Sequence, residues 1–381
     1  MNINERFKAF TKVFFTNFAI LLIFLFSPAL LFRFYKELYP RFLPSINQSS
    51  DKRAYYPTYE DKKFSIQLFN EFHNSSSKYR SFIGWRKENA NQKYTNISGP
   101  YNVRKSRGEG INNSVWFFGG STMWGTGASD SQTIPSHFNS LTNRTVYNFG
   151  EIGWTSRQSL NQLINVIGDE YSPSVVVFFD GVNDILYQCR SEINVLPVHG
   201  REKIIQNELK PLPIHKRISN FIFSPYIAIL KKFSFPLPLV NQINSNQYDC
   251  DINQAKARLI AKHLVNNWQT AYALSKSKDF EFYGILQPTL FTTKTNSEYF
   301  PTEEIRLNSD LEIQYRTIYP LILMEIERHC ETDKNFCYSF IDGTDWLDGT
   351  NNIFLDFCHI NSFGNKVIAQ RLQSLIKKNE N

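Results

Sequence analysis

Short apolar runs alternate with longer amphipathic stretches over the C-terminal two thirds of the chain. The apolar runs cover residues 115–118, 145–149, 175–179, 280–286 and 336–341. The helical patterns fall near residues 132–142, 156–170, 254–277, 304–329 and 362–378. Continuous apolar strands that alternate with helices are typical of a parallel sheet buried on both faces. The pattern therefore predicts an α/β fold, a three-layer α/β/α domain around a five-stranded parallel sheet.

Three stretches depart from this alternation. Residues 33–75 are polar with scattered Tyr, Pro and Ser, and we interpret them as a linker. Residues 78–110 hold several aromatic residues but show no clear period. Residues 186–251 are too apolar for a disordered loop and too long for a simple connection. We expect this insertion to form a cap over a site; because basic residues interleave there with Phe, Ile and Leu, a membrane-surface contact is the alternative.

An uncharged apolar run at residues 13–32 precedes the linker. As a helix, such a run rises about 30 Å, which is enough to cross a bilayer. A cleaved signal peptide and a buried core helix are the alternatives. Arg33 and Lys36 follow the run where a cleavage site would need small residues. We therefore expect an uncleaved transmembrane anchor.

The distribution of charge supports this interpretation. The 381 residues include 42 Lys and Arg and 35 Asp and Glu, which gives a formal charge of +7. Residues 1–50 contain six basic and two acidic residues, so the remainder of the chain carries only +3. A nearly neutral body excludes a broad nucleic-acid footprint. Both flanks of the apolar run are equally basic, so the charges do not predict its orientation.

The five cysteines give information about the cellular compartment in which the protein resides. Cys330 with Cys337, and Cys189 with Cys250, are the candidate disulfide pairs if the domain lies in an oxidising compartment. Cys358 would remain a free thiol. Five reduced thiols in a cytosolic domain are the alternative.

Three predicted strands are followed by small or polar residues suited to chemistry. Ser121 follows the first strand and two glycines, where its hydroxyl can project over the sheet edge. Gly153 follows the second strand and permits backbone N–H groups to approach a ligand closely. Asn183 follows the third strand and offers a side-chain amide of the type that stabilises an oxyanion. Taken singly, a turn or a helix cap also explains each residue.

Asp356 and His359 stand just before the last predicted helix. At this spacing an Asp can hold one nitrogen of a His while the other nitrogen faces a nucleophile. A solvated surface pair is the common alternative. Ser121, Gly153, Asn183 and the pair of Asp356 and His359 thus mark four short blocks of sequence. Because sites in open parallel sheets lie at the carboxyl ends of the strands, we expect all four blocks at one edge of the sheet.

The order of these blocks resembles the SGNH hydrolases, the superfamily of GDSL-like esterases. The resemblance implies a flavodoxin-like fold. It makes Ser121 the nucleophile and makes Asp356 and His359 the other members of a triad. It also implies an oxyanion hole formed by Gly153, Asn183 and the backbone N–H of Ser121.

The resemblance covers about residues 110–378. Upstream and downstream segments are also similar to a membrane-anchored branch associated with cell-surface polysaccharides: residues 78–104, with Tyr79, Trp85, Arg86 and Arg104, and Leu286-Gln287-Pro288. The chain is thereby divided into a tail at 1–12, a transmembrane anchor at 13–32, a juxtamembrane linker and lead-in at 33–109, and an SGNH hydrolase-like domain at 110–381 with a cap inserted at about 186–251.

Some positions depart from the family or suggest other chemistry. Gly120 stands where the family has the Asp of its G-D-S block. Since the triad does not use that Asp, we still expect activity. We expect Cys358 to be a small buried filler rather than a reactive thiol. We expect no metal site, because Asp342, Asp345 and Asp348 lack the spacing of a calcium loop and are interpreted as turn residues.

The resemblance implies a serine-dependent ester hydrolase that acts through an acyl-enzyme. With a membrane anchor and an extracytoplasmic domain, the expected substrate is an O-acylated, mainly O-acetylated, cell-surface glycan. The main alternative is a glycan O-acetyltransferase that uses the same triad and a multi-span membrane protein as acyl donor. A hydrolase of lipids or small esters and a non-catalytic glycan-binding or assembly protein are further alternatives. No cofactor and no nucleic-acid partner is expected.

Overall fold

A computed structural model describes most of the chain outside the N-terminal segment and the long insertion. The described residues are 5–21, 23, 27, 49, 51–167, 171–193, 214, 248–295 and 309–380. The predicted cap at 186–251 lies mostly outside them, as does part of the predicted membrane span at 13–32. The chain divides into two compact units, one of Met1–Ile46 with Ile204–Ser245 and one of Asn47–Lys203 with Asn246–Asn381.

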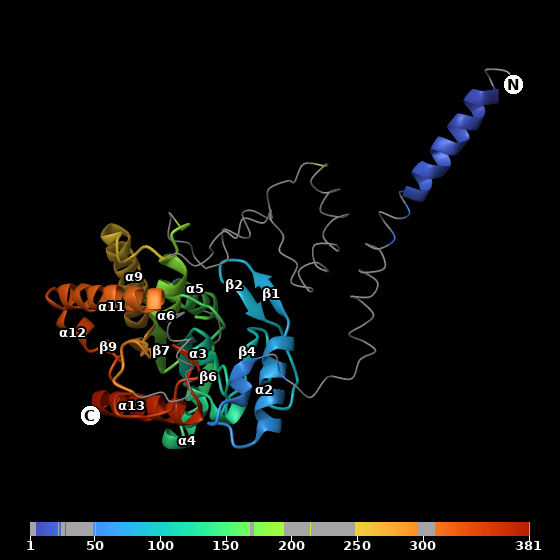
Figure 1. The fold of residues 1–381 in the computed structure, drawn as a ribbon. Helices are drawn as coiled ribbons and strands as arrows, with labels where there is room; N and C mark the ends of the chain where they lie inside the picture. Colours follow the sequence, from blue (N-terminus) through green and yellow to red (C-terminus); the bar gives the residue numbers. More distant parts are fainter. Residues whose placement is uncertain are drawn as a thin grey trace. The chain divides into compact units, whose positions relative to one another are not determined.

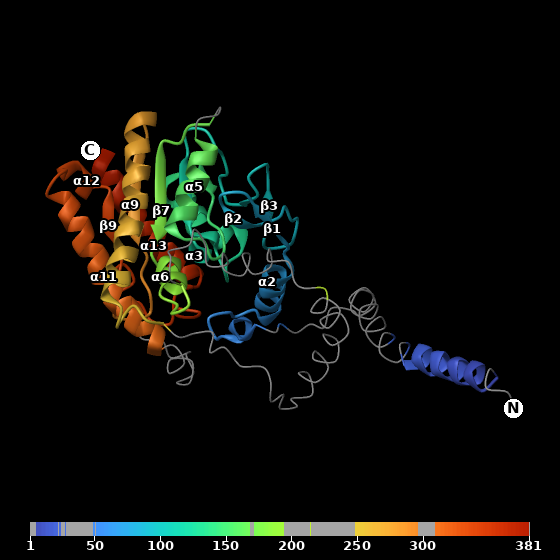
Figure 2. The same cartoon turned by 90° about the horizontal axis from the view of Figure 1, so that it is seen from above.

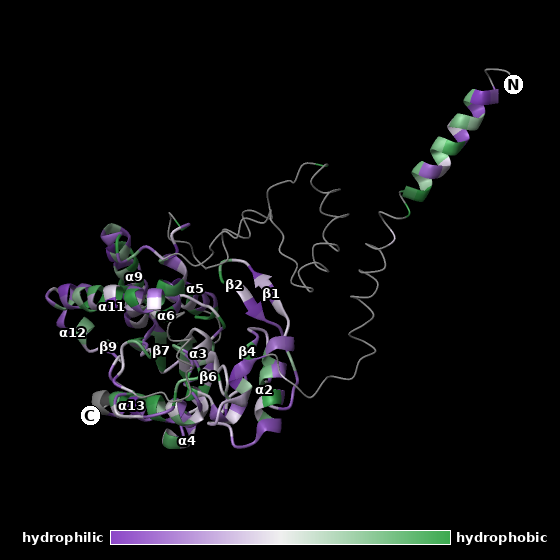
Figure 3. Ribbon diagram, viewed as in Figure 1, coloured by the Kyte–Doolittle hydropathy of each residue, from purple (hydrophilic) through white to green (hydrophobic). Residues whose placement is uncertain are grey.

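In the first unit the structure describes a helix over residues 5–21. Its first turns are hydrophilic and its later turns are increasingly hydrophobic (Figure 3). Among the described residues, none of the helices has both the length and the apolar character needed to span a membrane.

A seven-stranded sheet in the order β3-β4-β6-β5-β7-β8-β9 forms the centre of the second unit. Five neighbouring strands are parallel: β6 (Val146–Asn148), β5 (Val115–Gly119), β7 (Val175–Asp180), β8 (Glu281–Leu286) and β9 (Phe340–Asp342). Within this parallel part, the chain begins at β5, adds β6 on one side and then adds the other three strands on the opposite side. This is the strand order of flavodoxin-like folds, so the predicted α/β architecture is confirmed.

Two very short strands, β3 (Ile97–Ser98) and β4 (Val103–Arg104), extend the sheet antiparallel beside β6. The sequence did not predict them, because two-residue strands leave no periodic signal. The last apolar run also differs from expectation. Its first residues form α12 (Lys334–Cys337), and the strand begins only at Phe340.

Helices cover both faces of the sheet (Figures 1 and 2). One face packs against α5 (Ser156–Val166), α9 (Gln254–Lys278) and α11 (Ser309–Cys330), and the other against α4 (Ile134–Thr142) and α13 (Ser362–Glu380). Because successive strand residues point to opposite faces, Trp116 joins the first cluster while Phe117 joins the second. This double burial explains why the strands are continuously apolar.

The segment before the sheet is folded, contrary to the linker expected at residues 33–75. Its described part contains η1 (Lys52–Tyr55) and α2 (Lys62–Asn74), which lead into a hairpin of β1 (Ser77–Arg80) and β2 (Gly84–Lys87). Leu68 and Phe69 of α2 are buried against Leu355, beside the predicted His block. Only one side of α2 is apolar, and it is this contact that holds the helix in place.

Two disulfides are present, and both match the predicted pairs. Cys189–Cys250 closes the base of the insertion, where the N–H of Asp249 also donates to the carbonyl of Cys189 at 2.9 Å. Cys330–Cys337 links the end of α11 to α12. Two disulfides fit an oxidising compartment.

The two disulfides should differ in their contribution to stability. They span 61 and 7 residues of sequence. In the chain-entropy picture the longer loop is worth about 2 kcal/mol more. The Cys189→Ser/Cys250→Ser variant should therefore lose more free energy of unfolding than Cys330→Ser/Cys337→Ser, measured by denaturant titration. Equal losses would contradict the role of the long loop.

Candidate active site

Ser121 lies at the carboxyl end of β5, at the point where the strand order reverses. It is the first residue of the short helix α3 (Ser121–Trp124), and Gly120 precedes it in extended conformation. The side chain of Thr122 faces the C-terminal loop, where its Oγ1 donates to the carbonyl of Cys358 at 3.1 Å. Gln287, which follows β8, donates to Thr122 Oγ1 at 2.8 Å. The end of β8 thus ties the Ser block to the His block.

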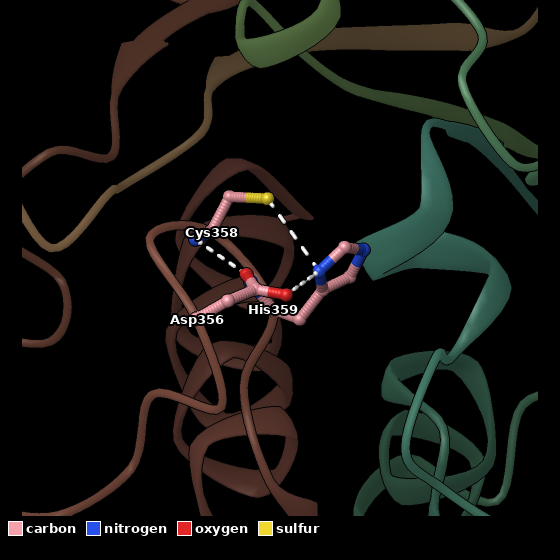
Figure 4. Close-up of side chains that lie close together, drawn as sticks. All are labelled: Asp356, Cys358 and His359. Atoms are coloured by element: carbon pink, nitrogen blue, oxygen red, sulfur yellow. Dashed lines mark hydrogen bonds and ion pairs between the residues drawn. The ribbon is translucent and has the colours of Figure 1, made fainter. Parts of the chain in front are cut away.

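The structure brings Ser121, His359 and Asp356 into a continuous chain of hydrogen-bonding contacts. Nε2 of His359 lies 2.6 Å from Oγ of Ser121. Nδ1 of His359 lies 2.5 Å from Oδ2 of Asp356, and Figure 4 shows the imidazole turned so that its other nitrogen points away from this carboxylate. The His can therefore accept the Ser proton at Nε2 while Nδ1–H donates to Asp356.

The carboxylate of Asp356 is fully supplied with donors. Its Oδ1 accepts the backbone N–H groups of Cys358 and His359, at 3.0 and 2.8 Å. Its Oδ2 accepts from His359 and from Nη1 of Arg53, the latter at 2.8 Å. Although burial raises the pKa of Asp356, the charges of His359 and Arg53 hold it well below its usual range. Asp356 is thus ionised at any working pH.

Asn183 lies beside Ser121, at the start of α6 (Val182–Gln188). Its Nδ2 donates to the carbonyl of Trp154 at 2.8 Å, which joins the Asn block to the Gly block. A Cβ added at Gly120 would collide with this Nδ2 atom. A side chain at Gly120 would therefore require the Asn183 amide to shift.

Gly153 adopts φ +72°, a left-handed conformation that favours glycine. A Cβ there would lie 2.7 Å from Oη of Tyr187 on α6. The start of α5 is fixed to α6 as well, because the hydroxyl of Ser156 donates to Oδ1 of Asp184 at 2.6 Å. The structure thus places Gly153 and Asn183 on two loops that are held together.

The lead-in supports the Gly block directly. Arg86 is buried with its guanidinium 4.8 Å from the ring centroid of Trp154. The indole N–H of Trp154 donates to the carbonyl of Trp85 at 3.1 Å. Oε2 of the buried Glu151 accepts the backbone N–H of Lys87 at 2.9 Å. These contacts account for the lead-in residues that the sequence singled out in this region.

Arg104 and Tyr79, also singled out, have different surroundings. Arg104 is buried over the ring of Trp124, 4.2 Å from its centroid, and its Nε donates to Asp130 at 2.8 Å. It therefore packs against α3, the helix that ends with Trp124. Tyr79 is about half exposed and packs edge-on against Trp85.

A pocket of about 180 Å³ opens beside Gly153. Aromatic and polar side chains of the lead-in, the Gly block and α6 line it: Phe72, His73, Ser77, Trp85, Lys87, Glu151, Ile152, Trp154, Gln158 and Tyr187. Such a mixture suits a ligand with both apolar faces and hydroxyl groups.

Three potential metal ligands, from Asp356, Cys358 and His359, lie within 4.8 Å of one another (Figure 4). The positive group already at this carboxylate is the guanidinium of Arg53. Burial raises the pKa of the Cys358 thiol far above its usual value, so the sulfur is protonated and a poor metal ligand. The donor set therefore fits a guanidinium better than a metal ion, and Cys358 is the buried free thiol that was expected.

Asp342 ends β9, and Asp345 and Asp348 lie in the turns that follow it. Oδ1 of Asp342 accepts the N–H and the hydroxyl of Thr344, and Oδ1 of Asp348 accepts the N–H of Lys294 at 2.7 Å. Asp345 is exposed. These contacts are those of turn residues.

A sequence model of the GDSL-like Lipase/Acylhydrolase family matches residues 115–372. The chain belongs to this family. Membership makes the protein a serine esterase of the GDSL type, and the residues of the site described above, from Ser121 to His359, lie within the matched range. None of the curated proteins compared with the chain matches it.

Solved structures that resemble the chain include three bacterial proteins. A carbohydrate acetylesterase family member from Sinorhizobium meliloti is 13% identical, with 70% of this chain and 98% of that chain covered and a TM-score of 0.35. A lipolytic protein of the G-D-S-L family from Veillonella parvula is 11% identical, with 68% and 96% covered and a TM-score of 0.33. A GDSL-like lipase from Bacteroides thetaiotaomicron is 13% identical, with 70% and 89% covered and a TM-score of 0.32. Membership of the family rests on the sequence match.

Arg53 is the site residue that the sequence did not predict, together with its partners Asp51 and His73. No local motif marks it, because its contact with Asp356 spans 303 positions. It also lies in the segment interpreted as a linker.

The steric role of Gly120 can be tested in this GDSL esterase. Gly120→Ala should lower kcat/KM by up to roughly a hundredfold, the effect of losing one oxyanion donor, because the new Cβ displaces Asn183. In an Asn183→Ala background the same substitution should add little, since the displaced group is gone. Independent, multiplicative losses in ester turnover would contradict this explanation.

Proposed function

We propose that this GDSL esterase removes O-acyl groups, chiefly O-acetyl groups, from a cell-surface glycan through an acyl-enzyme on Ser121. The observation that carries the proposal is the hydrogen-bonded chain from Ser121 through His359 to Asp356. A serine hydroxyl becomes a useful nucleophile only beside an oriented base. In this chain the base, His359, contacts both the hydroxyl of Ser121 and its orienting carboxylate, Asp356.

The reaction follows from this geometry. Nε2 of His359 takes the proton of the Ser121 hydroxyl as Oγ attacks the ester carbonyl. The backbone N–H groups of Ser121 and Gly153 and the amide of Asn183 stabilise the negative charge that develops on the carbonyl oxygen. The tetrahedral intermediate collapses as the bond between the acyl carbon and the sugar oxygen breaks, and the imidazolium gives its proton to that oxygen, which leaves as a hydroxyl group. Water, deprotonated by His359, then attacks the acyl-enzyme and releases the carboxylic acid.

The glycan part of the proposal is supported by the pocket beside Gly153. Aromatic rings with polar groups between them are suited to stacking on sugar faces and bonding to hydroxyl groups. Gly153, one of the proposed oxyanion donors, lines this pocket. The two disulfides support an extracytoplasmic location, and residues 13–32 are proposed as the membrane anchor.

The nucleophile assignment is tested with a small acetyl ester. Ser121→Ala should lower turnover by roughly 10⁴-fold or more, because no other group forms the acyl-enzyme. Ser131→Ala is a matched control, since Ser131 is exposed on η2 (Asp130–Gln132). Unchanged turnover in Ser121→Ala would contradict the assignment of Ser121 as the nucleophile.

The biological acceptor is tested on the glycan itself. Mass analysis should show more acetyl groups on the surface glycan of cells that carry Ser121→Ala than on that of wild-type cells. Fewer acetyl groups would identify a transferase, in which a sugar hydroxyl replaces water in the second step. No change would contradict a role in glycan acetylation.

A further inference from the structure

We propose that Arg53 is a positioning residue of the active site, acting on His359 through the carboxylate of Asp356. The inference rests on the proposed function, because it assumes that His359 activates Ser121. Arg53 lies outside residues 115–372, which the family model matches, and so belongs to none of the family's blocks. It enters the site because the lead-in folds against the loop that carries Asp356.

The guanidinium of Arg53 bridges two carboxylates. Nη1 donates to Oδ2 of Asp356 at 2.8 Å, while Nε and Nη2 donate to the two carboxylate oxygens of Asp51 at 3.0 and 2.7 Å. A planar guanidinium that binds one carboxylate through two N–H groups has a fixed orientation. Its remaining Nη1 group is therefore aimed at Asp356 rather than free to rotate.

Asp51 is itself held in place. It caps η1, where its Oδ1 accepts the backbone N–H of Arg53 at 3.0 Å, and its Oδ2 lies 2.8 Å from Nε2 of His73 on α2. The guanidinium also lies 5.1 Å from the ring centroid of Phe69. Side-chain exposure is 18% for Arg53 and 8% for Asp51, so solvent screens this network much less than it screens a surface ion pair.

An effect on the imidazole follows. Arg53 and the backbone donors together prevent the Asp356 carboxylate from rotating, which fixes the direction in which Nδ1–H points. Nη1 of Arg53 also lies 3.4 Å from Nδ1 of His359, so the guanidinium contacts the imidazole as well as the carboxylate. In the described part of the chain, the charged groups in contact with the imidazole are Asp356 and Arg53. The Cys358 thiol and the Ser121 hydroxyl are neutral.

The test uses the full-length protein and a small acetyl ester. Arg53→Met removes both the positive charge and the N–H donors. Arg53→Lys keeps the charge but lacks the planar set of N–H donors. Lys52→Met is a matched control that removes an exposed charge from the neighbouring position. Arg53→Met should lower kcat roughly ten- to a hundredfold with little change in KM, which is less than the ~10⁴-fold loss of a mispositioned triad. Arg53→Lys should recover part of this loss, and Lys52→Met should match wild type.

The comparison of kcat with KM separates positioning from a purely structural role. A positioning defect slows the chemical step and leaves KM for the small ester nearly unchanged, whereas a general disturbance of the lead-in should raise KM as well. The split between kcat and KM is therefore the readout, and it should return toward wild type in Arg53→Lys. A kcat equal to that of Lys52→Met would overturn the proposal. Should Arg53→Met fail to fold, as judged by its thermal melt, the kcat of Arg53→Lys decides, and a wild-type value there overturns the proposal. Failure of this proposal can be told apart from failure of the proposed function, because in the second case Ser121→Ala would remain active.

Discussion

A partly buried carboxylate needs a donor for each of its lone pairs, and the arrangement of this site depends on how Asp356 obtains them. Two donors are backbone N–H groups of its own loop, one is the imidazole of His359, and one is the guanidinium of Arg53. The loop, the imidazole and the lead-in therefore meet at a single anion. None of the three can shift without leaving a charged oxygen short of a partner, which is costly in a poorly solvated place.

The lead-in supports more than this carboxylate. Arg53 contacts the His block, Arg86 packs on the Gly block, and Arg104 packs on the helix that begins with Ser121. Each guanidinium lies near an aromatic ring and donates hydrogen bonds as well, a combination that lysine supplies poorly. The site of this GDSL esterase thus lies at one edge of the central sheet, and three arginines from the lead-in, which is not part of the parallel sheet, hold it in place.

The sheet and most helices could be predicted from the sequence because burial on both faces leaves long apolar runs, as at residues 175–179. The four blocks could be placed because strand ends of a parallel sheet converge. The folding of residues 51–74 was not predicted, because the polar residues around α2 suggest a linker and the residue against which its apolar side packs, Leu355, lies far away in the sequence. The contact between Arg53 and Asp356 is invisible for the same reason, because it exists only once two distant segments have packed.

The Cys189–Cys250 bridge determines how the insertion is attached to the fold. It holds the end of α6 and the approach to α9 side by side, with Cα atoms 5.2 Å apart. The two ends of the insertion are therefore fixed by a covalent bond rather than by the residues between them. A change in the length or composition of that segment is then absorbed on the far side of the bridge from the sheet.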